Sequence, residues 1–542
     1  MKRNKTKYIL GVLFAVILSS CVNDLNVTPI DPNLETADKL FTDEDSYKMV
    51  LAKVYGSFTL TGQEGPAGQP DIQGIDEGFS NYLRQYWSLQ ELPTEEALVA
   101  WDDATIKDFH YQTWTSTDVF IMAAYSRIFY TISLANEFIR VADAKIPEIE
   151  GTFKEHLINF RAEARFIRAF SYWHAIDLFG NVPFVTEDDK PGTFLPKQIS
   201  RADLFDYLES ELLELQNELM EPKQNEYGRV DKVAAWMLLA KLYLNAEVYN
   251  GTDRYTDALT YIKKMIDSPY SLDPSFTRIF AADNNESPEI IFSLGMDGLY
   301  TQSYGGTTFI LNAGTGDVMP DTGVDGKWGG FRTGKELVGY FGLQESDFTV
   351  EDPTDSTRAD KRGKFFFHPA SWTWDIDNVG TFTNGIGVMK YTNFTSTGGT
   401  APDAHNSYAS TDYVVFRLAD AYLMYAEAVL RGASGGDKAT ALGYVNALRE
   451  RGFGNADHNI SESDLTLDFI LEERARELYW EGHRRTDLIR FGKFTGDALL
   501  WQWKGKVKEG VGTESFRALY PIPENDMMSN PNLVQNEGYI NH

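Results

Sequence analysis

Three aromatic residues lie outside any helical or strand pattern, in segments rich in glycine and acidic side chains: Trp101, Tyr304 and Trp328. Acidic residues flank Trp101 on both sides, and glycine pairs follow Tyr304 and Trp328. A flat ring in such a loop can stack on the apolar C–H face of a hexose while nearby polar groups bind its hydroxyls. The pattern indicates sugar recognition. The alternative is burial in a core, which is common for large aromatic side chains.

Glu477 and Glu481 are two carboxylates that could cleave a glycosidic bond. They lie four residues apart, which places them on the same face of a helix. Four arginines lie close to them in the sequence: Arg474, Arg476, Arg484 and Arg485. Structural ion pairs hold carboxylates just as catalytic sites do. We therefore favour a neutralised network that stabilises a helix over a catalytic pair.

The remaining chemistry-bearing residues form no recognisable constellation. The eight histidines show no HExxH motif or close ligand pairing, and a single cysteine excludes a thiolate metal site. His174 lies among core-type aromatics and is interpreted as a hydrogen-bonded core histidine. A phosphate loop fails because Met319 stands where a third glycine is needed after Gly314 and Gly316. We expect no catalytic residue, no metal and no cofactor.

Composition and charge narrow the class of partner. The chain has 542 residues, of which 43% are hydrophobic, enough for a large core in one extended domain or two interlocked ones. Its formal net charge is −29. A phosphate backbone must be met by clustered cations, so nucleic acid is not an expected partner. A neutral polysaccharide is indifferent to this charge.

The N-terminus has the pattern of a secretion signal. Four cations precede an apolar run from Tyr8 to Leu18, which is shorter than a membrane-spanning helix requires. The following Leu18-Ser19-Ser20-Cys21 resembles the lipobox of bacterial lipoproteins, in which the cysteine is acylated. We expect a signal peptide at residues 1–20, lipid attachment at Cys21 and a tether at residues 21–42. The alternative is an ordinary signal followed by an idle thiol.

Helical periodicity covers two stretches of the chain, about residues 119–267 and 413–482. The apolar spacing predicts helices over the following ranges: 43–58, 119–144, 162–178, 201–219, 230–248, 255–266, 334–341, 413–431, 438–451 and 465–482. Paired helices of this length, with small residues at close-packing positions, suggest tetratricopeptide-like hairpins. Residues 61–118 and 273–411 lack a helical period apart from 334–341, and we interpret them as loop-rich ligand regions with short strands.

Five segments resemble the SusD/RagB family, the glycan-binding outer-membrane lipoproteins of Bacteroidetes-type nutrient uptake systems. They occur in the expected order: AEARFIRAFSYWHAIDLFGNVPF, GRVDKVAAWMLLAKLYLNA, VVFRLADAYLMYAEAVLRG, ERARELYWEGHRRTDLIRFG and YPIPENDMMSNPNLVQNEGY. The resemblance implies a mainly α fold in which tetratricopeptide-like hairpins pack against a loop-rich region with short strands, here at residues 43–542. It also implies a surface-exposed lipoprotein of the outer membrane that delivers glycan to a SusC-like TonB-dependent transporter.

The family's starch-binding prototype has similar segments around the aromatic residues. ELPTEEALVAW matches a platform tryptophan at Trp101, DGLYTQSYGGTTF matches a stacking tyrosine at Tyr304, and Trp328 lies where a third aromatic belongs. Arg84, in NYLRQYW, matches a polar contact. Three aromatics on separate loops would form an arc, which suits an α-1,4-glucan such as starch or a maltooligosaccharide because that chain already curves.

Two departures from the prototype weaken the assignment of the glycan. Val99 replaces a second tryptophan and Ala104 replaces an asparagine, with Asp102 and Asp103 as candidate substitutes for the missing hydroxyl-binding groups. A β-glucan, xyloglucan or another hexose polymer therefore stays open. Two other functions also stay open, a surface glycoside hydrolase and a structural transporter subunit without sugar affinity.

Overall fold

The computed structural model describes residues 41–189, 192, 194–403, 405 and 407–539. The predicted signal peptide, Cys21 and all but the last two residues of the predicted tether lie outside the described residues. Two units can be distinguished, residues 1–50 and 51–542, and the contacts described below all lie within the second. The predicted extent of a single ligand-binding domain, residues 43–542, remains a prediction.

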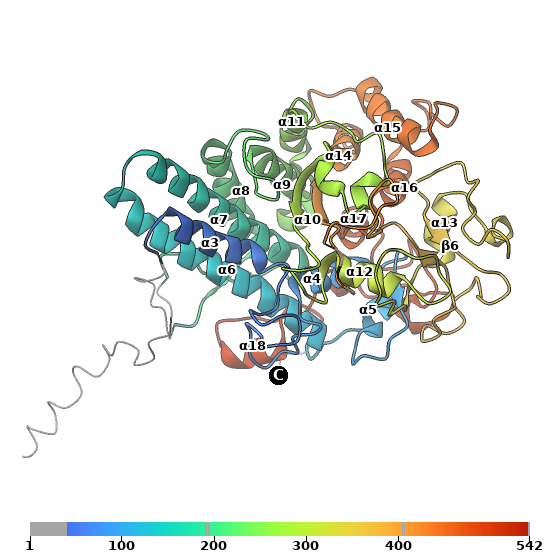
Figure 1. Ribbon diagram of the computed structural model, residues 1–542, viewed down its shortest axis with the longest axis horizontal. Helices are drawn as coiled ribbons and strands as arrows, with labels where there is room; N and C mark the ends of the chain where they lie inside the picture. Colours follow the sequence, from blue (N-terminus) through green and yellow to red (C-terminus); the bar gives the residue numbers. More distant parts are fainter. Residues whose placement is uncertain (1–40, 190–191, 193, 404, 406, 540–542) are drawn as a thin grey trace, which may run out of the picture. The chain divides into compact units, whose positions relative to one another are not determined.

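Successive long helices lie side by side in the first half of the chain (Figure 1). They are α6 (Val119–Lys145), α7 (Gly151–Leu178), α8 (Arg201–Glu218), α9 (Lys232–Leu244) and α11 (Tyr255–Ile266). Each contacts the next, and α11 also contacts α14 (Leu418–Leu430), so the two helical stretches of the sequence form one continuous region. The predicted mainly α architecture, with helical hairpins beside a loop-rich region that contains short strands, is confirmed.

Local sequence explains where the central helices begin and what they bury. Asp118 caps α6 by accepting the amide hydrogens of Phe120 and Ile121, both at 2.9 Å. The second half of α7 is buried on all sides. Its His174 lies in the core as predicted, and Nδ1 is 2.7 Å from the hydroxyl of Tyr82. Burial holds the pKa of this histidine well below its ordinary value.

Several predicted helices have different ends in the structure. The predicted 162–178 helix is the C-terminal part of α7, which begins at Gly151. The 230–248 helix breaks at Asn245 into α9 and α10 (Ala246–Asn250). In place of the predicted 465–482 helix, α16 (Leu467–Leu478) ends where Tyr479 leaves helical backbone, with ψ 140°. The positive φ angles of Trp480 and Gly482 separate it from α17 (Arg484–Arg490).

The predicted 413–431 helix starts as a strand. Residues Tyr413–Arg417 form β8, which pairs antiparallel with β4 (Ile290–Leu294), and α14 begins only at Leu418. Aromatic and β-branched residues fill β8, and both strands are almost wholly buried, an environment that favours extended backbone over helix for such side chains.

The regions predicted as loop-rich hold more regular structure than expected. Helices α4 (Tyr82–Glu91), α5 (Lys107–Tyr111) and α12 (Gly306–Gly314) were not predicted, whereas α13 (Lys335–Tyr340) was. The short strands pair as β1 (Leu98–Val99) with β5 (Phe331–Arg332), β2 (Val182–Pro183) with β3 (Gln198–Ile199), and β6 (Phe365–Phe366) with β7 (Gly387–Val388). The α-helices of the described residues not yet named are α3 (Glu44–Gly56), α15 (Lys438–Phe453) and α18 (Glu524–Ser529).

Candidate ligand-binding site

A two-residue ladder brings the two predicted tryptophans together. Strands β1 and β5 are antiparallel with Val99 opposite Phe331, and the Ala100 amide donates to the Gly330 carbonyl at 2.9 Å. Trp101 follows β1 and Trp328 precedes β5, so both leave the ladder at the same end. Their ring centroids are 6.4 Å apart with the planes at 58°.

The Trp101 ring is fixed from two sides. Its Nε1 donates to the carbonyl oxygen of Gly329 at 3.0 Å, and its face stacks on Phe331 with centroids 5.6 Å apart at 24°. Gly330 has φ +105°, and a Cβ there would collide with Nε1 and lie 2.9 Å from Cδ1 of Trp101. A glycine at position 330 is therefore required for this ring position.

Tyr304 extends the row of rings. It precedes α12, its centroid lies 5.9 Å from that of Trp328 at 70°, and it stacks on Tyr408 at 6.0 Å and 27°. The order in space is Trp101, Trp328, Tyr304 and Tyr408, and we call these four the aromatic row. All four are half-buried. Burial, then a hydrogen bond with Tyr304, raises the pKa of Tyr408 to about 12.

Sequence reasoning missed Tyr408, although the signal was present. It lies in a segment of glycine, proline, serine and threonine that matches the context of Tyr304. Asn312, in the last turn of α12, connects the loop of Tyr408 to the loop of Trp328. Its Nδ2 donates to the Ser407 carbonyl at 2.7 Å, and its Oδ1 accepts from the Lys327 amide at 3.2 Å. One buried amide thus holds the loops of Tyr408 and Trp328.

Arg84 belongs to α4, which contacts α12 (Figure 1). Its Nη1 donates to the carbonyls of Gly78 at 3.1 Å and Tyr304 at 3.3 Å. The guanidinium lies over the ring of Phe309 at 4.5 Å. Burial lowers the pKa of Arg84 to about 10 despite the opposing charge of Asp103, so it is protonated at neutral pH.

A cavity of about 240 Å³ adjoins Arg84 and Trp101 and is also lined by Asp103 and Ala104. Asp102 does not line it. That carboxylate is exposed and forms an ion pair with Lys107. Val99 is buried in β1, so this departure from the prototype lies in the core. Of the predicted residues, Arg84, Trp101 and Asp103 line this cavity, whereas Asp102, Tyr304 and Trp328 do not. Tyr304 and Trp328 join the site through the ring contacts of the aromatic row.

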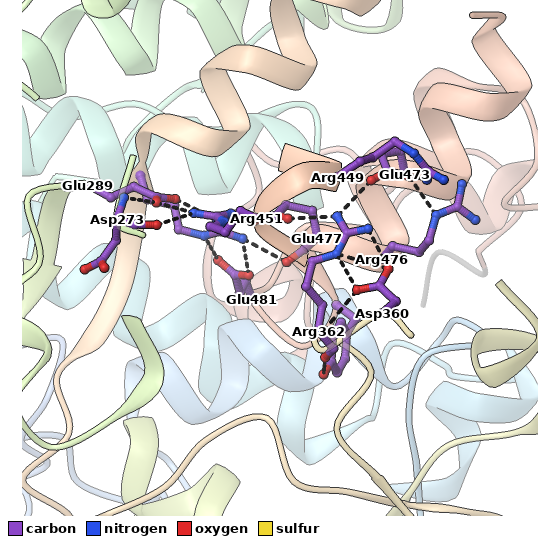
Figure 2. Close-up of polar contacts among 12 residues, drawn as sticks. Asp273, Glu289, Asp360, Arg362, Arg449, Arg451, Glu473, Arg476, Glu477 and Glu481 are labelled. Carbon is purple, nitrogen blue, oxygen red and sulfur yellow. Dashed lines mark hydrogen bonds and ion pairs between the residues drawn. The ribbon is translucent and has the colours of Figure 1, made fainter. Parts of the chain in front are cut away.

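Glu477 and Glu481 belong to a buried ion-pair network (Figure 2). Glu477 pairs with Arg451, with Arg417 at 2.7 Å and with Arg362 at 3.0 Å. Glu481 pairs with Arg417 at 2.7 Å and Lys390 at 2.5 Å. Burial alone would raise the pKa of Glu477, but the three arginines outweigh it and hold that pKa well below its usual range.

The interpretation as a neutralised network is therefore confirmed, but with other cations. The arginines predicted to surround the pair contact different carboxylates: Arg474 pairs with Asp420 and Asp487, Arg476 with Glu473, Arg484 with Glu95, and Arg485 with Asp177. Residues distant in the sequence supply the actual partners. A carboxylate held ionised in this way is a poor general acid.

Among the described residues, no group of three or more His, Cys, Asp or Glu side chains could hold a metal ion. No helix in this part of the chain is long and apolar enough to cross a membrane.

Comparisons with known proteins agree with the fold. Residues 288–539 match the SusD family. The chain is 35% identical to the starch-binding protein SusD of Bacteroides thetaiotaomicron, over 99% of this chain and 100% of that protein. A SusD-like protein of Bacteroides ovatus is 24% identical over 92% of this chain and 86% of its own length.

Solved structures of lower identity share the same fold. Surface glycan-binding protein A of Bacteroides thetaiotaomicron, solved in complex with laminarihexaose, has a TM-score of 0.66 at 20% identity, covering 91% of this chain and 100% of that one. A laminarin-binding SusD-like protein has a TM-score of 0.67 at 22% identity, covering 92% and 100%. With the near-complete alignment at 35% identity, these findings confirm the resemblance in the sequence motifs, and the chain belongs to the SusD family.

Proposed function

We propose that this protein binds a glycan without cleaving it, and that the aromatic row is the binding platform. The observation that supports this most directly is the succession of Trp101, Trp328 and Tyr304, with centroid separations of 6.4 and 5.9 Å, on three separate loops. Rings held this close offer successive sugar faces a continuous surface at little cost in conformational entropy. SusD-family proteins bind carbohydrate and are not catalysts.

The glycan we favour is an α-1,4-glucan, starch or a maltooligosaccharide. The rings are tilted at 58° and 70° to one another, which suits a ligand that curves. The relative with 35% identity is a starch-binding protein, whereas the laminarin-related structures are only 20% and 22% identical. Arg84 and Asp103 would bind hydroxyls beside the row, with Asp102 nearby on the surface.

Location and partner are part of the same proposal and rest on family membership. Cys21 would carry the acyl chains that hold the protein at the outer membrane, with the aromatic row exposed at the cell surface. A SusC-like TonB-dependent transporter would receive the glycan. Co-purification of that transporter with the tagged protein would test the partner. Replacing Cys21 by serine would test the anchor, because the variant protein should no longer be found in the membrane fraction.

Calorimetric titration with amylopectin, laminarin and xyloglucan tests the binding function. We expect amylopectin to bind, and Trp101→Ala or Trp328→Ala to weaken binding about tenfold or more, since each removes a stacked ring. Trp236→Ala is the matched control, because this tryptophan lies on α9, outside the aromatic row. Trp236 is also half-buried.

The possible outcomes distinguish the proposed function from its alternatives. Binding to laminarin or xyloglucan alone would keep the platform and reject starch. Equal loss in the Trp236→Ala variant would reject the platform. Release of reducing ends from any polymer would show a glycoside hydrolase, and no binding together with an intact transporter complex would favour a structural subunit.

A further inference from the structure

A second cavity, of about 530 Å³, has four cations among its eleven lining residues. It adjoins the ladder of β6 and β7, where the Met389 amide donates to the Lys364 carbonyl at 2.7 Å. Lys364 directly precedes β6, and Arg358 and Lys361 come from the loop before it. Three cations thus follow one another at intervals of three residues around one cavity.

These cations have no carboxylate at ion-pair distance among the described residues, although acidic residues outnumber basic ones by 79 to 50 in the chain. Nη1 of Arg358 donates to the Gly363 carbonyl, whereas its Nε is buried without a hydrogen-bond partner. Nζ of Lys361 donates to the Arg358 carbonyl. The side chain of Lys364 is half-buried.

The neighbouring acidic groups are engaged elsewhere. Asp352 accepts from the hydroxyls of Thr354 and Ser356, at 3.0 and 2.7 Å, and Asp355 accepts from Thr357 at 3.2 Å. Asp360 pairs with Arg362 at 2.7 Å. A fourth cation that lines the cavity, Lys390, is already paired with Glu481 at 2.5 Å. The local carboxylates moderate the field of the three cations but do not pair with them.

Burial and mutual repulsion make the charged forms of these cations unfavourable, and a bound anion would offset this. Burial lowers the pKa of Lys364, and the like charges of Arg358 and Lys361 lower it further. Burial also lowers the pKa of Arg358, against the opposing charge of Asp355. Removing cations from water beside one another is unfavourable unless an opposite charge joins them.

We propose that this cavity binds a small oxyanion, either inorganic phosphate or the charged group of an anionic sugar. Arg358, Lys361 and Lys364 supply positive charge, and Thr277, which also lines the cavity, supplies a hydroxyl. This ligand differs in charge from the neutral glucan proposed for the aromatic row. The cavity volume lies in the range of small-molecule sites.

Thermal unfolding and calorimetry of the full-length protein, purified in detergent, test the site with inorganic phosphate and with glucuronate at constant ionic strength. We expect at least one of the two to raise Tm and to bind, with affinity falling as sodium chloride is added. The Arg358→Gln/Lys364→Gln variant should bind about tenfold more weakly or not at all. Lys438→Gln, which removes an exposed cation at the start of α15, should bind like the wild type.

The exposed Lys361→Gln variant covers the case in which the double variant fails to fold, and it should bind more weakly at unchanged Tm without ligand. Binding of phosphate alone would identify inorganic phosphate, and binding of glucuronate alone an anionic sugar. No binding of either probe, or equal binding by wild type and all variants, would overturn the proposal. Amylopectin titration of the same samples measures the aromatic row independently.

Discussion

The indole Nε1 of Trp101 donates a hydrogen bond of 3.0 Å to the carbonyl oxygen of Gly329, the residue that follows Trp328. One tryptophan of the aromatic row is therefore anchored to the loop of the other. The two rings cannot reorient independently, because moving either loop breaks this bond and the ladder beside it. Because the loops are already ordered before the ligand binds, the free energy of stacking contributes to affinity instead of offsetting the entropy lost in ordering them.

Gly330→Ala should weaken glycan binding about tenfold or more, because the new Cβ would collide with the Trp101 indole and tilt the platform. Positive φ also carries a conformational cost of about 1–3 kcal/mol for a residue other than glycine. Gly398→Ala separates the two effects, since Gly398 has φ +85° and nothing within 4 Å of its added Cβ. Titration and thermal unfolding of both variants would show the difference. Equal affinity losses would contradict the fixed-ring interpretation.

Much of the helical region could be predicted from sequence, and the reason is length. The apolar period of α8 and α11 repeats over several turns and gave their ends to within a residue. The strands β1 and β5 have two residues each, too few for a period to be visible. For this reason the sequence predicted Trp101 and Trp328 as separate loop aromatics, and what joins them had to come from the structure.

The ion-pair network likewise could be predicted only in part from the sequence. Sequence neighbours suggested Arg474 and Arg476 as partners of Glu477, whereas the structure supplies Arg362 and Arg417 from distant segments. The kind of interaction could be predicted, because a carboxylate on a buried helix needs a cation. The partners could not, because tertiary packing selects them.

Asn312→Asp should weaken glycan binding and change the intrinsic tryptophan fluorescence. The substitution replaces the Nδ2 donor by a carboxylate oxygen facing the carbonyls of Thr308 and Ser407, so the loops of Trp328 and Tyr408 lose their common anchor. Asn217→Asp is the control, because Nδ2 of Asn217 also donates to the carbonyl four residues back but lies exposed on α8. Wild-type fluorescence and affinity in the Asn312 variant would disprove the anchoring role.

Arg84→Lys should lower affinity about tenfold although the charge is kept. A lysine has one ammonium group and no planar face, so it cannot both hold the carbonyls of Gly78 and Tyr304 and cover the ring of Phe309. Arg140→Lys provides a matched comparison, since Arg140 donates to the carbonyls of Glu187 and Asp189, each at 2.9 Å, in the helical region. Calorimetric titration of the pair would reveal whether the effect is specific to the aromatic row.

Glu477→Gln should destabilise the protein by about 3–5 kcal/mol, the usual cost of removing one partner from a buried ion pair. Three arginines would lose their shared carboxylate charge within the core. Glu472→Gln, on the same helix, should cost less than about 1 kcal/mol, because Glu472 is half exposed and its ion pair with Arg476 spans 3.4 Å. Urea unfolding measures both, and similar losses would show that the network contributes little.

Lowering the pH should remove the contribution of ionised Glu473 to the free energy of unfolding, over a definite pH range. Burial alone would raise the pKa of this carboxyl, but Arg362, Arg476 and Arg449 outweigh it and lower the pKa to about 2. A group whose folded pKa is depressed stabilises the fold fully above its unfolded pKa, about 4.3, and loses that contribution as pH falls toward the folded value. The free energy of unfolding of wild type and Glu473→Gln should therefore converge as pH falls below about 4.3.

Urea titrations of the two proteins between pH about 6 and 3 would measure this convergence, since that window spans the unfolded pKa and most of the loss. Glu462→Gln, at an exposed position before α16, should give a curve close to that of the wild type. A constant gap between wild type and Glu473→Gln would mean that the arginines do not hold Glu473 ionised. The network would then stabilise the helix by packing and hydrogen bonding alone, and the cost predicted for Glu477→Gln would have to be revised with it.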